Sequence, residues 1–416
     1  METTQPAGSS PANPAPQQPG PPPAPSSPAG KEPRPAAPLP PGPPARRAPQ
    51  GPTELAAADP AKPRVRVSSP SDVLAVVPHL FGFHPARSLV VIGAGGRREH
   101  VKLGFRYDLP DPPDAAAAAD IAEHAVSVLA HRQATSVIGV GYGPGRLVTP
   151  AVDALAVAVR GRGLRLRELM RVEDGRYWSY LCRNVNCCPA EGVAFDYRSH
   201  PAAAVMTAAG MAAYPDRAAL ERTVAPVTGA AAKDMELAVG RACDRAAVLV
   251  AQAVRKRRGN ALRPVIEEGK RAVGDAIRVY RDGGRITDPD QLAWLMVTLA
   301  NLPVRDDAWA RMIPEHHRAH MALWADIVRW ASGPWLPAPA ALLAFTAWQS
   351  GDGALANIAL DRALAADPGY SMARLLRDIL DAGVPPSEAR LPMTPEQVAK
   401  SYARADRAKG ARGRAR

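Results

Sequence analysis

Three of the four cysteines in this chain lie within seven residues of one another, in the segment CRNVNCCP. Cys182, Cys187 and Cys188 could be structural thiols, redox-active thiols, a catalytic thiol or metal ligands, because thiolates are nucleophiles and bind soft ions. A structural zinc site needs four ligands, and we do not expect adjacent Cys187 and Cys188 to share one tetrahedral ion easily. His200 or Cys243 could supply a further ligand, so these alternatives stay open.

A glycine-rich segment, IGVGYGPGRLVTP, is the second candidate for chemistry. Its glycines are Gly139, Gly141, Gly143 and Gly145. They follow an apolar strand and precede a helix that we expect to begin at Thr149 and Pro150, a setting in which backbone amides bind phosphate. The alternate spacing differs from dinucleotide-binding and Walker loops, so a tight connection that needs positive φ is the competing interpretation. If a ligand binds there, Tyr142 and Arg146 should lie beside it.

Aromatic and histidine clusters add two weaker candidates. Trp178 stands among three aromatic residues in RYWSY and could form the wall of a ligand pocket, although the sequence favours a cross-strand aromatic core pair. His316 and His320 are spaced to share one helix face. The segment HHRAH lacks the glutamate that an HExxH hydrolase requires, so we expect a solvated helix face.

Residues 64–200 contain the strand signals that must position these groups. Apolar runs at 88–93 and 135–140 predict buried strands, and paired strands are predicted at 99–109, 164–172 and 176–182. Helical patterns alternate with them, which predicts an α/β domain with a mixed or mostly parallel sheet flanked by helices. A ligand site would then lie at the carboxyl ends of the strands that hold Ile92 and Val140.

Residues 201–395 show helical patterns alone and predict an all-helical domain. The predicted helices are 230–258, 261–282, 289–301, 304–331, 338–350, 354–366 and 370–382. Residues 396–416 form a basic tail. Residues 1–63 are rich in proline and alanine and cannot bury enough apolar surface to fold, so we expect a disordered N-terminal tail.

Composition narrows the class of protein. The net charge is +12, yet no nucleic-acid-binding motif is evident and the basic residues are scattered, so a nucleic-acid partner is not expected. The sequence shows no apolar stretch of membrane-spanning length and no signal peptide. A cytoplasmic protein with free thiols is the resulting expectation.

Four blocks of the sequence resemble an actinobacterial family of uncharacterised proteins, the domain of unknown function 4192. They are RVSSPSDVLAVVPHLFGFHPARSLVVIG, GYGPGRLVTPAVDAL, RYWSYLCRNVNCCPAEG and AWQSGDGALANIALDRALAADPGYSMARLL. The resemblance covers about residues 64–386 and implies a bacterial cytosolic protein without an assigned activity. Residues 337–370 also resemble a single tetratricopeptide-like helix pair, with Ala356 and Ala363 where the helices cross.

Two classes of function follow as hypotheses. The first is an α/β module that binds a small anionic or nucleotide-like molecule through the glycine segment and the strand of Trp178. The second is a protein-protein interaction through the helical domain, with an exposed apolar groove beside Trp348. Neither a reaction nor a cofactor can be assigned from the sequence.

Overall fold

The computed structural model describes residues 67–96, 100–209, 211, 213–256, 260–388 and 393–414, with side chains up to residue 405. The predicted disordered tail at 1–63 lies outside these residues. The same holds for the start of the predicted α/β domain at 64–66 and for the end of the helix predicted at 230–258.

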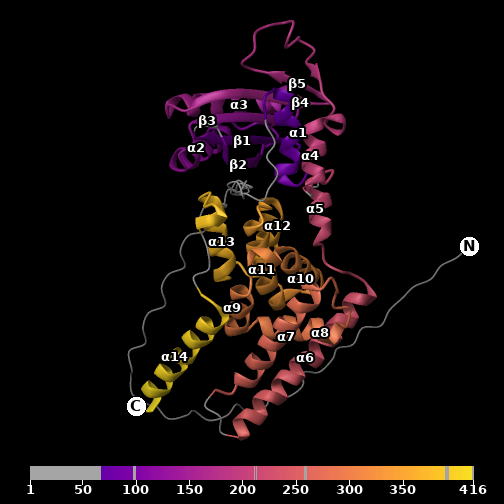
Figure 1. The fold of residues 1–416 in the computed structure, drawn as a ribbon, viewed down its shortest axis with the longest axis vertical. Coiled ribbons are helices and arrows are strands. Elements are labelled where there is room, and N and C mark those ends of the chain that lie inside the picture. The colour runs from indigo at the N-terminus through magenta and orange to yellow at the C-terminus, as the bar shows by residue number, and fades with distance from the viewer. Residues whose placement is uncertain are drawn as a thin grey trace, which may run out of the picture. The chain divides into compact units, whose positions relative to one another are not determined.

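A six-stranded mixed sheet forms the first part of the described chain, in the order β2-β1-β3-β4-β5-β6 (Figure 1). The strands are β1 (Ser88–Gly95), β2 (His100–Asp108), β3 (Ser136–Tyr142), β4 (Arg165–Glu173), β5 (Arg176–Ser179) and β6 (Val193–Ala194). Only the β3–β4 pair is parallel, and the other pairs are antiparallel. The sheet is therefore mixed, because hairpins join β1 to β2 and β4 to β5, while one helical crossover joins β3 to β4.

The pairing of β1 with β3 overturns the expected position of a ligand site. These strands run antiparallel, with Ile92 opposite Ile138 and Val90 opposite Val140. Because β1 and β3 are antiparallel, the carboxyl end of one lies beside the amino end of the other. The prediction that the strands of Ile92 and Val140 end together was wrong, because two buried apolar runs do not reveal their relative direction.

Helices α2 (Ala115–His131) and α3 (Gly145–Gly161) cover one face of the sheet. Their apolar residues pack on Leu89, Val91 and Val137 in one buried cluster. Asp114 caps α2, because its carboxylate accepts the N–H groups of Ala116 and Ala117. The alternation of apolar residues in the strands thus gives the sheet one face for these two helices.

Helix α1 (Pro70–Phe81) packs on α4 (Pro201–Ala208). Ser69 caps α1, since it accepts the Asp72 N–H at 3.1 Å and Asp72 accepts the Ser69 N–H at 2.9 Å. The helix continues through Pro78 to Phe81, three residues beyond the proline.

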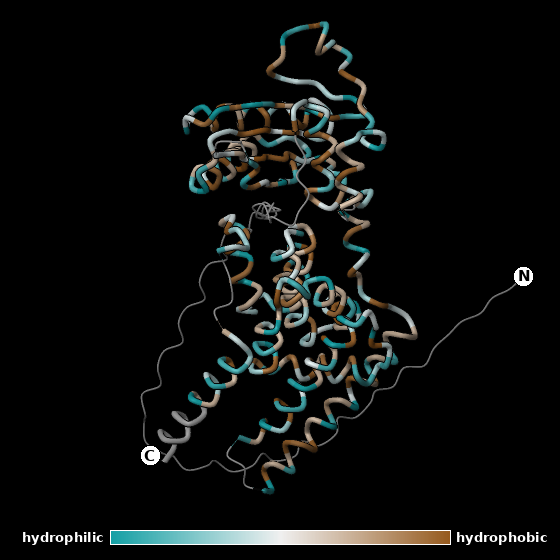
Figure 2. The backbone as a smooth tube through the Cα atoms, in the orientation of Figure 1, coloured by the Kyte–Doolittle hydropathy of each residue, from teal (hydrophilic) through white to brown (hydrophobic). Residues whose placement is uncertain are grey.

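Helices follow the sheet, and no strand occurs after Ala194 among the described residues. The helices are α5 (Arg217–Thr223), α6 (Ala230–Arg255), α7 (Arg263–Arg281), α8 (Pro289–Leu299), α9 (Leu302–Ala310), α10 (His317–Trp330), α11 (Pro337–Gln349), α12 (Gly353–Ala366), α13 (Ser371–Asp381) and α14 (Pro395–Arg414). Figure 2 shows mixed hydrophobic and hydrophilic residues along α6 and α7, whereas α14 is largely hydrophilic. No described helix is both long enough and apolar enough to cross a membrane.

The helix predicted at 304–331 is two helices, because Pro314 follows the end of α9 and starts a short 3-10 turn before α10. The break removes the shared face predicted for His316 and His320. His320 lies inside the helical core with no exposed surface. The solvated histidine face was therefore wrong.

Helices α11 and α12 occupy the predicted positions of the tetratricopeptide-like pair. Gly351 takes a φ of 79° in the turn between them, and Ala356 and Ala363 are fully buried. The assignment to that repeat family stays a prediction. Trp348 is only 1% exposed, so the expected apolar groove does not open at this side chain.

Candidate metal centre

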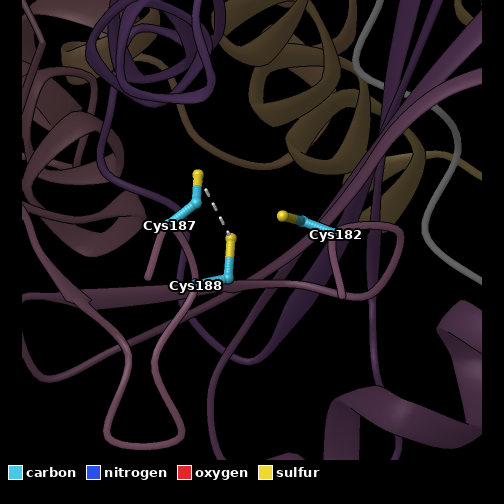
Figure 3. A group of neighbouring side chains, drawn as sticks. All are labelled: Cys182, Cys187 and Cys188. Atoms are coloured by element: carbon cyan, nitrogen blue, oxygen red, sulfur yellow. Dashed lines mark hydrogen bonds between the residues drawn. The ribbon is translucent and has the colours of Figure 1, made fainter. Parts of the chain in front are cut away.

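The cysteine-bearing loop follows β5 and brings three thiols together. The sulfur atoms of Cys182, Cys187 and Cys188 all lie within 4.8 Å of one another. Those of Cys187 and Cys188 are 4.0 Å apart, and Figure 3 shows the three side chains converging. Cys187 is exposed and the other two are half-buried, so the sulfur triangle borders solvent.

Ser179 fixes the first cysteine of the group. Its hydroxyl oxygen accepts the N–H groups of Leu181 at 3.2 Å and Cys182 at 3.1 Å. The same hydroxyl donates to Oε1 of Glu168 at 2.8 Å, and this oxygen also accepts the Leu169 N–H. The turn ends β5 at Ser179, three residues before the predicted end of the strand, because a side-chain oxygen satisfies two backbone donors.

Asn184 brings the other two cysteines back toward the first. Its carbonyl oxygen accepts the N–H groups of Cys187 at 3.1 Å and Cys188 at 2.8 Å. Its side-chain oxygen accepts the Asn186 N–H at 3.0 Å. The resulting tight turn explains how neighbouring cysteines on one short loop can face the same point.

Trp178 packs against the end of the loop at Ala190 and Gly192. Its indole N–H donates to the Ala190 carbonyl oxygen at 2.9 Å, and the Arg171 guanidinium lies 3.8 Å from its ring centroid. Gly192 has a φ of 79°, and a Cβ atom there would come within 2.6 Å of the indole ring. The predicted pocket-wall residue therefore contacts the loop itself, and Arg176 adds a bond to the Gly192 carbonyl oxygen at 2.9 Å.

The surroundings shift the pKa values of Cys182 and Cys188 in opposite directions. The backbone hydrogen bond from Asn184, followed by hydrogen bonding with Cys188, lowers the pKa of Cys182. Burial raises the pKa of Cys188 to about 12, and its hydrogen bonds with the other two cysteines add to the effect. Without a metal, Cys182 is thus the first of these two thiols to ionise, and a metal bound at neutral pH must displace the proton of Cys188.

The sulfur triangle fits a soft metal ion. Zinc–sulfur bonds of about 2.3 Å in a tetrahedron place the sulfur atoms roughly 3.8 Å apart. The 4.0 Å separation of Cys187 and Cys188 is close to that edge. The turn at Asn184 brings the sulfur atoms of adjacent Cys187 and Cys188 to this separation, which one tetrahedral ion could span.

The two residues proposed as a fourth ligand lie elsewhere. The Nδ1 atom of His200 accepts the Ala202 N–H at 3.2 Å at the start of α4, and its Nε2 atom is 3.6 Å from Oδ1 of Asp72. Cys243 lies in the middle of α6. Among the described residues, the group that could hold a metal contains the three loop cysteines alone.

The glycines of the second candidate segment are explained mainly by packing. Gly139 and Gly141 lie inside β3, where a Cβ atom would come within 2.5 Å of Leu169 and 2.1 Å of Val148. They allow α3 and its neighbours to approach the sheet closely. Gly143, with a φ of 129°, makes the turn that follows.

Helix α3 begins at Gly145, four residues before the predicted start at Thr149 and Pro150. Arg146 is exposed and forms an ion pair with Asp111 at 3.2 Å. Tyr142 does not lie beside an open site: it is 9% exposed, and burial raises the pKa of its hydroxyl. The predicted start was late because proline is tolerated within the first turns of a helix.

A groove in the helical part was not predicted from the sequence. Its volume is about 560 Å³, and it lies between α7, the end of α9 and the start of α14. Basic side chains dominate its lining: Lys270, Arg271, Arg278, Arg281 and Arg311. Asp275 is the acidic residue of the lining. A helical-wheel count of basic residues on α7 is the signal that could have found it.

Comparison with known proteins identifies the family of the chain but assigns it no activity. The family model described as a domain of unknown function (DUF4192) matches residues 70–387. No curated protein and no solved structure matches the chain. The match spans the sheet, the cysteine loop and the helices up to α13, and it ends within the 3-10 turn Pro386–Glu388. The chain therefore belongs to the family of the domain of unknown function DUF4192.

Proposed function

We propose that this protein binds a thiophilic metal ion, with zinc as the best fit, through Cys182, Cys187 and Cys188. The observation that carries the proposal is the mutual approach of three sulfur atoms within 4.8 Å on one braced loop. Thiolates favour zinc and other soft ions over magnesium or calcium. The bound ion would tie the loop after β5 into a fixed conformation.

The support comes from how the loop is held. Ser179 and Asn184 satisfy the backbone around the thiols, and Trp178 anchors the distal end. Metal sites depend on such outer partners to orient their ligands. A cytoplasmic location, which we also propose, would keep the thiols reduced and available.

Zinc stoichiometry tests the proposal. The full chain, reduced and dialysed against limiting free zinc, should retain about one ion per chain, as expected for one site. Cys188→Ser should abolish retention, whereas Cys243→Ser, in α6, serves as a matched thiol control and should retain the ion. Absence of zinc from the reduced wild-type chain, or equal loss in both variants, would overturn the proposal.

A second candidate function is the binding of an anionic small molecule, and the groove of about 560 Å³ with five basic lining residues favours it. This site lies in the helical part, away from the glycine segment on which the sequence hypothesis relied. Three of its arginines already pair with nearby carboxylates, Arg278 with Asp275, Arg281 with Asp282 and Arg311 with Asp307. The excess positive charge is therefore smaller than the residue types suggest.

Calorimetric titration with inorganic pyrophosphate tests this second function. A saturable signal that weakens with salt and disappears in Lys270→Glu/Arg271→Glu supports it. Arg160→Glu, on the exposed end of α3, controls for a general change in charge. An equal loss in the Arg160 variant would show that the binding is non-specific.

A further inference from the structure

The cysteine site offers three ligands, whereas a closed zinc site has four. We infer that an ion bound to Cys182, Cys187 and Cys188 keeps its fourth coordination position open for an exchangeable external ligand, of which a small-molecule thiol is the favoured class. The inference rests on the proposed metal binding and goes one step further. It assigns this site to ligand exchange instead of a purely structural role.

The placement of the three sulfurs leaves one side of the ion uncovered. All three ligands come from a single seven-residue segment, and Figure 3 shows Cys182 facing Cys187 and Cys188 across the loop. The exposure of Cys187 shows that solvent reaches the triangle. Four-ligand structural sites enclose their ion with two separate pairs of ligands, and such a second pair is missing from the described residues around this loop.

Two side chains that could be considered as a fourth ligand, Glu168 and His200, make contacts of their own. Glu168 uses Oε1 to accept bonds from Ser179 and from the backbone of Leu169. His200 uses one ring nitrogen to cap α4 and directs the other toward Asp72. These contacts favour an external molecule over either side chain as the fourth ligand.

The chemistry of the site selects the ligand class. Three thiolates make a soft coordination shell, and soft ions prefer a further sulfur donor to a hard oxygen donor. A small thiol would enter as its thiolate, release its proton to solvent and displace the resting water. No oxidation or reduction accompanies this exchange, so no co-reactant is required.

Cobalt substitution tests the inference because tetrahedral Co²⁺ reports its ligands through visible absorption. The full chain is reduced with a phosphine, which adds no thiol, and loaded with Co²⁺. 2-Mercaptoethanol is then titrated. We expect one Co²⁺ per chain and a saturable rise of about one third in the sulfur-to-cobalt charge-transfer band, as three thiolates become four.

Two variants make the result specific. His200→Asn keeps an N-capping side chain for α4 and should leave both the starting spectrum and the thiol response unchanged. Cys243→Ser should also behave as wild type. A starting spectrum that changes in either variant would identify an internal fourth ligand and overturn the inference.

The remaining outcomes are separable. Co²⁺ that binds but does not respond to the thiol, or one ion shared by two chains, overturns the open position and leaves metal binding intact. Failure of the reduced wild-type chain to bind either Co²⁺ or zinc overturns both claims together.

Discussion

The glycine segment, which spans the end of β3 and the start of α3, and the loop after β5 both contain closely spaced residues of a chemically suggestive type, but these residues have different roles in the structure. In the first, a Cβ atom at Gly141 would come within 2.1 Å of Val148, so packing accounts for the glycine. In the second, three sulfur atoms lie within 4.8 Å of one another, and Cys187 is exposed to solvent. A spacing pattern therefore indicates chemistry only after packing demands are accounted for.

The largest effect should come from filling the β3–α3 contact. Gly141→Val places a branched side chain against Val148, which is itself stiff in its helix, and should lower the free energy of unfolding by about 3 kcal/mol. Urea denaturation measures the change. Gly161→Ala, at the end of α3 where a Cβ atom meets nothing within 4 Å, should be neutral or slightly stabilising.

The packing explanation of Gly141 would be contradicted if Gly141→Val folded with wild-type stability yet lost the ability to bind an anion. The glycine segment would then be a ligand site, as its spacing first suggested. Zinc affinity of the folded Gly141 variant should equal that of wild type, since a Cβ atom at Gly141 would meet Val148 of α3 and none of the three cysteines.

Replacing Trp178 should have the second-largest effect, which is a loss of zinc affinity at the cysteine loop. Trp178→Ala loses the contact with Arg171 and the bond to Ala190, so zinc affinity should fall between tenfold and about 100-fold. Competition with a chromogenic chelator measures the affinity. Trp178→Phe keeps an aromatic ring for Arg171 and should lose less zinc affinity. Equal zinc affinities in the wild type and both variants would show that Trp178 does not help to hold the cysteine loop.

Ser179→Ala should have a more modest effect. The substitution removes the oxygen that accepts the Leu181 and Cys182 N–H groups, which should cost about 1 kcal/mol of stability. Zinc affinity should fall only a few-fold, because Asn184 still positions Cys187 and Cys188. Ser179→Thr retains the hydroxyl and is the matched control. Restoration by threonine would tie the loss to the hydroxyl oxygen.

Arg146→Ala should have the smallest effect, both on stability against urea and on zinc affinity. Its ion pair with Asp111 is largely exposed, and such pairs contribute little to stability. Neither the urea midpoint nor zinc affinity should change measurably. A marked loss of either would mean that the start of α3 contributes more than the geometry indicates.

Sequence patterns predicted much of the local structure and less of its assembly. The caps at Ser69 and Asp114 mark helix starts because side-chain oxygens satisfy local backbone donors. The direction of β1 relative to β3 was not predictable, since burial of both strands erases the alternation that reveals pairing. The burial of His320 depends on the break at Pro314, which a helical pattern of apolar residues conceals.

The candidate site shows the same limit. The three cysteines were evident from their spacing, but their convergence depends on carbonyl contacts of Asn184 and on the hydroxyl of Ser179. Those contacts depend on backbone conformation, which residue types do not specify. The roles of Arg171 and Gly192 around Trp178 are tertiary contacts that become visible only in the folded chain.

X-ray absorption at the zinc edge of the reduced, zinc-loaded full chain tests the central claim most directly, because it counts the ligands by element. Three sulfur atoms at about 2.3 Å and one oxygen or nitrogen atom at about 2.0 Å are the predicted shell. A shell of oxygen and nitrogen atoms without three sulfurs would contradict the assignment of Cys182, Cys187 and Cys188 as the metal site.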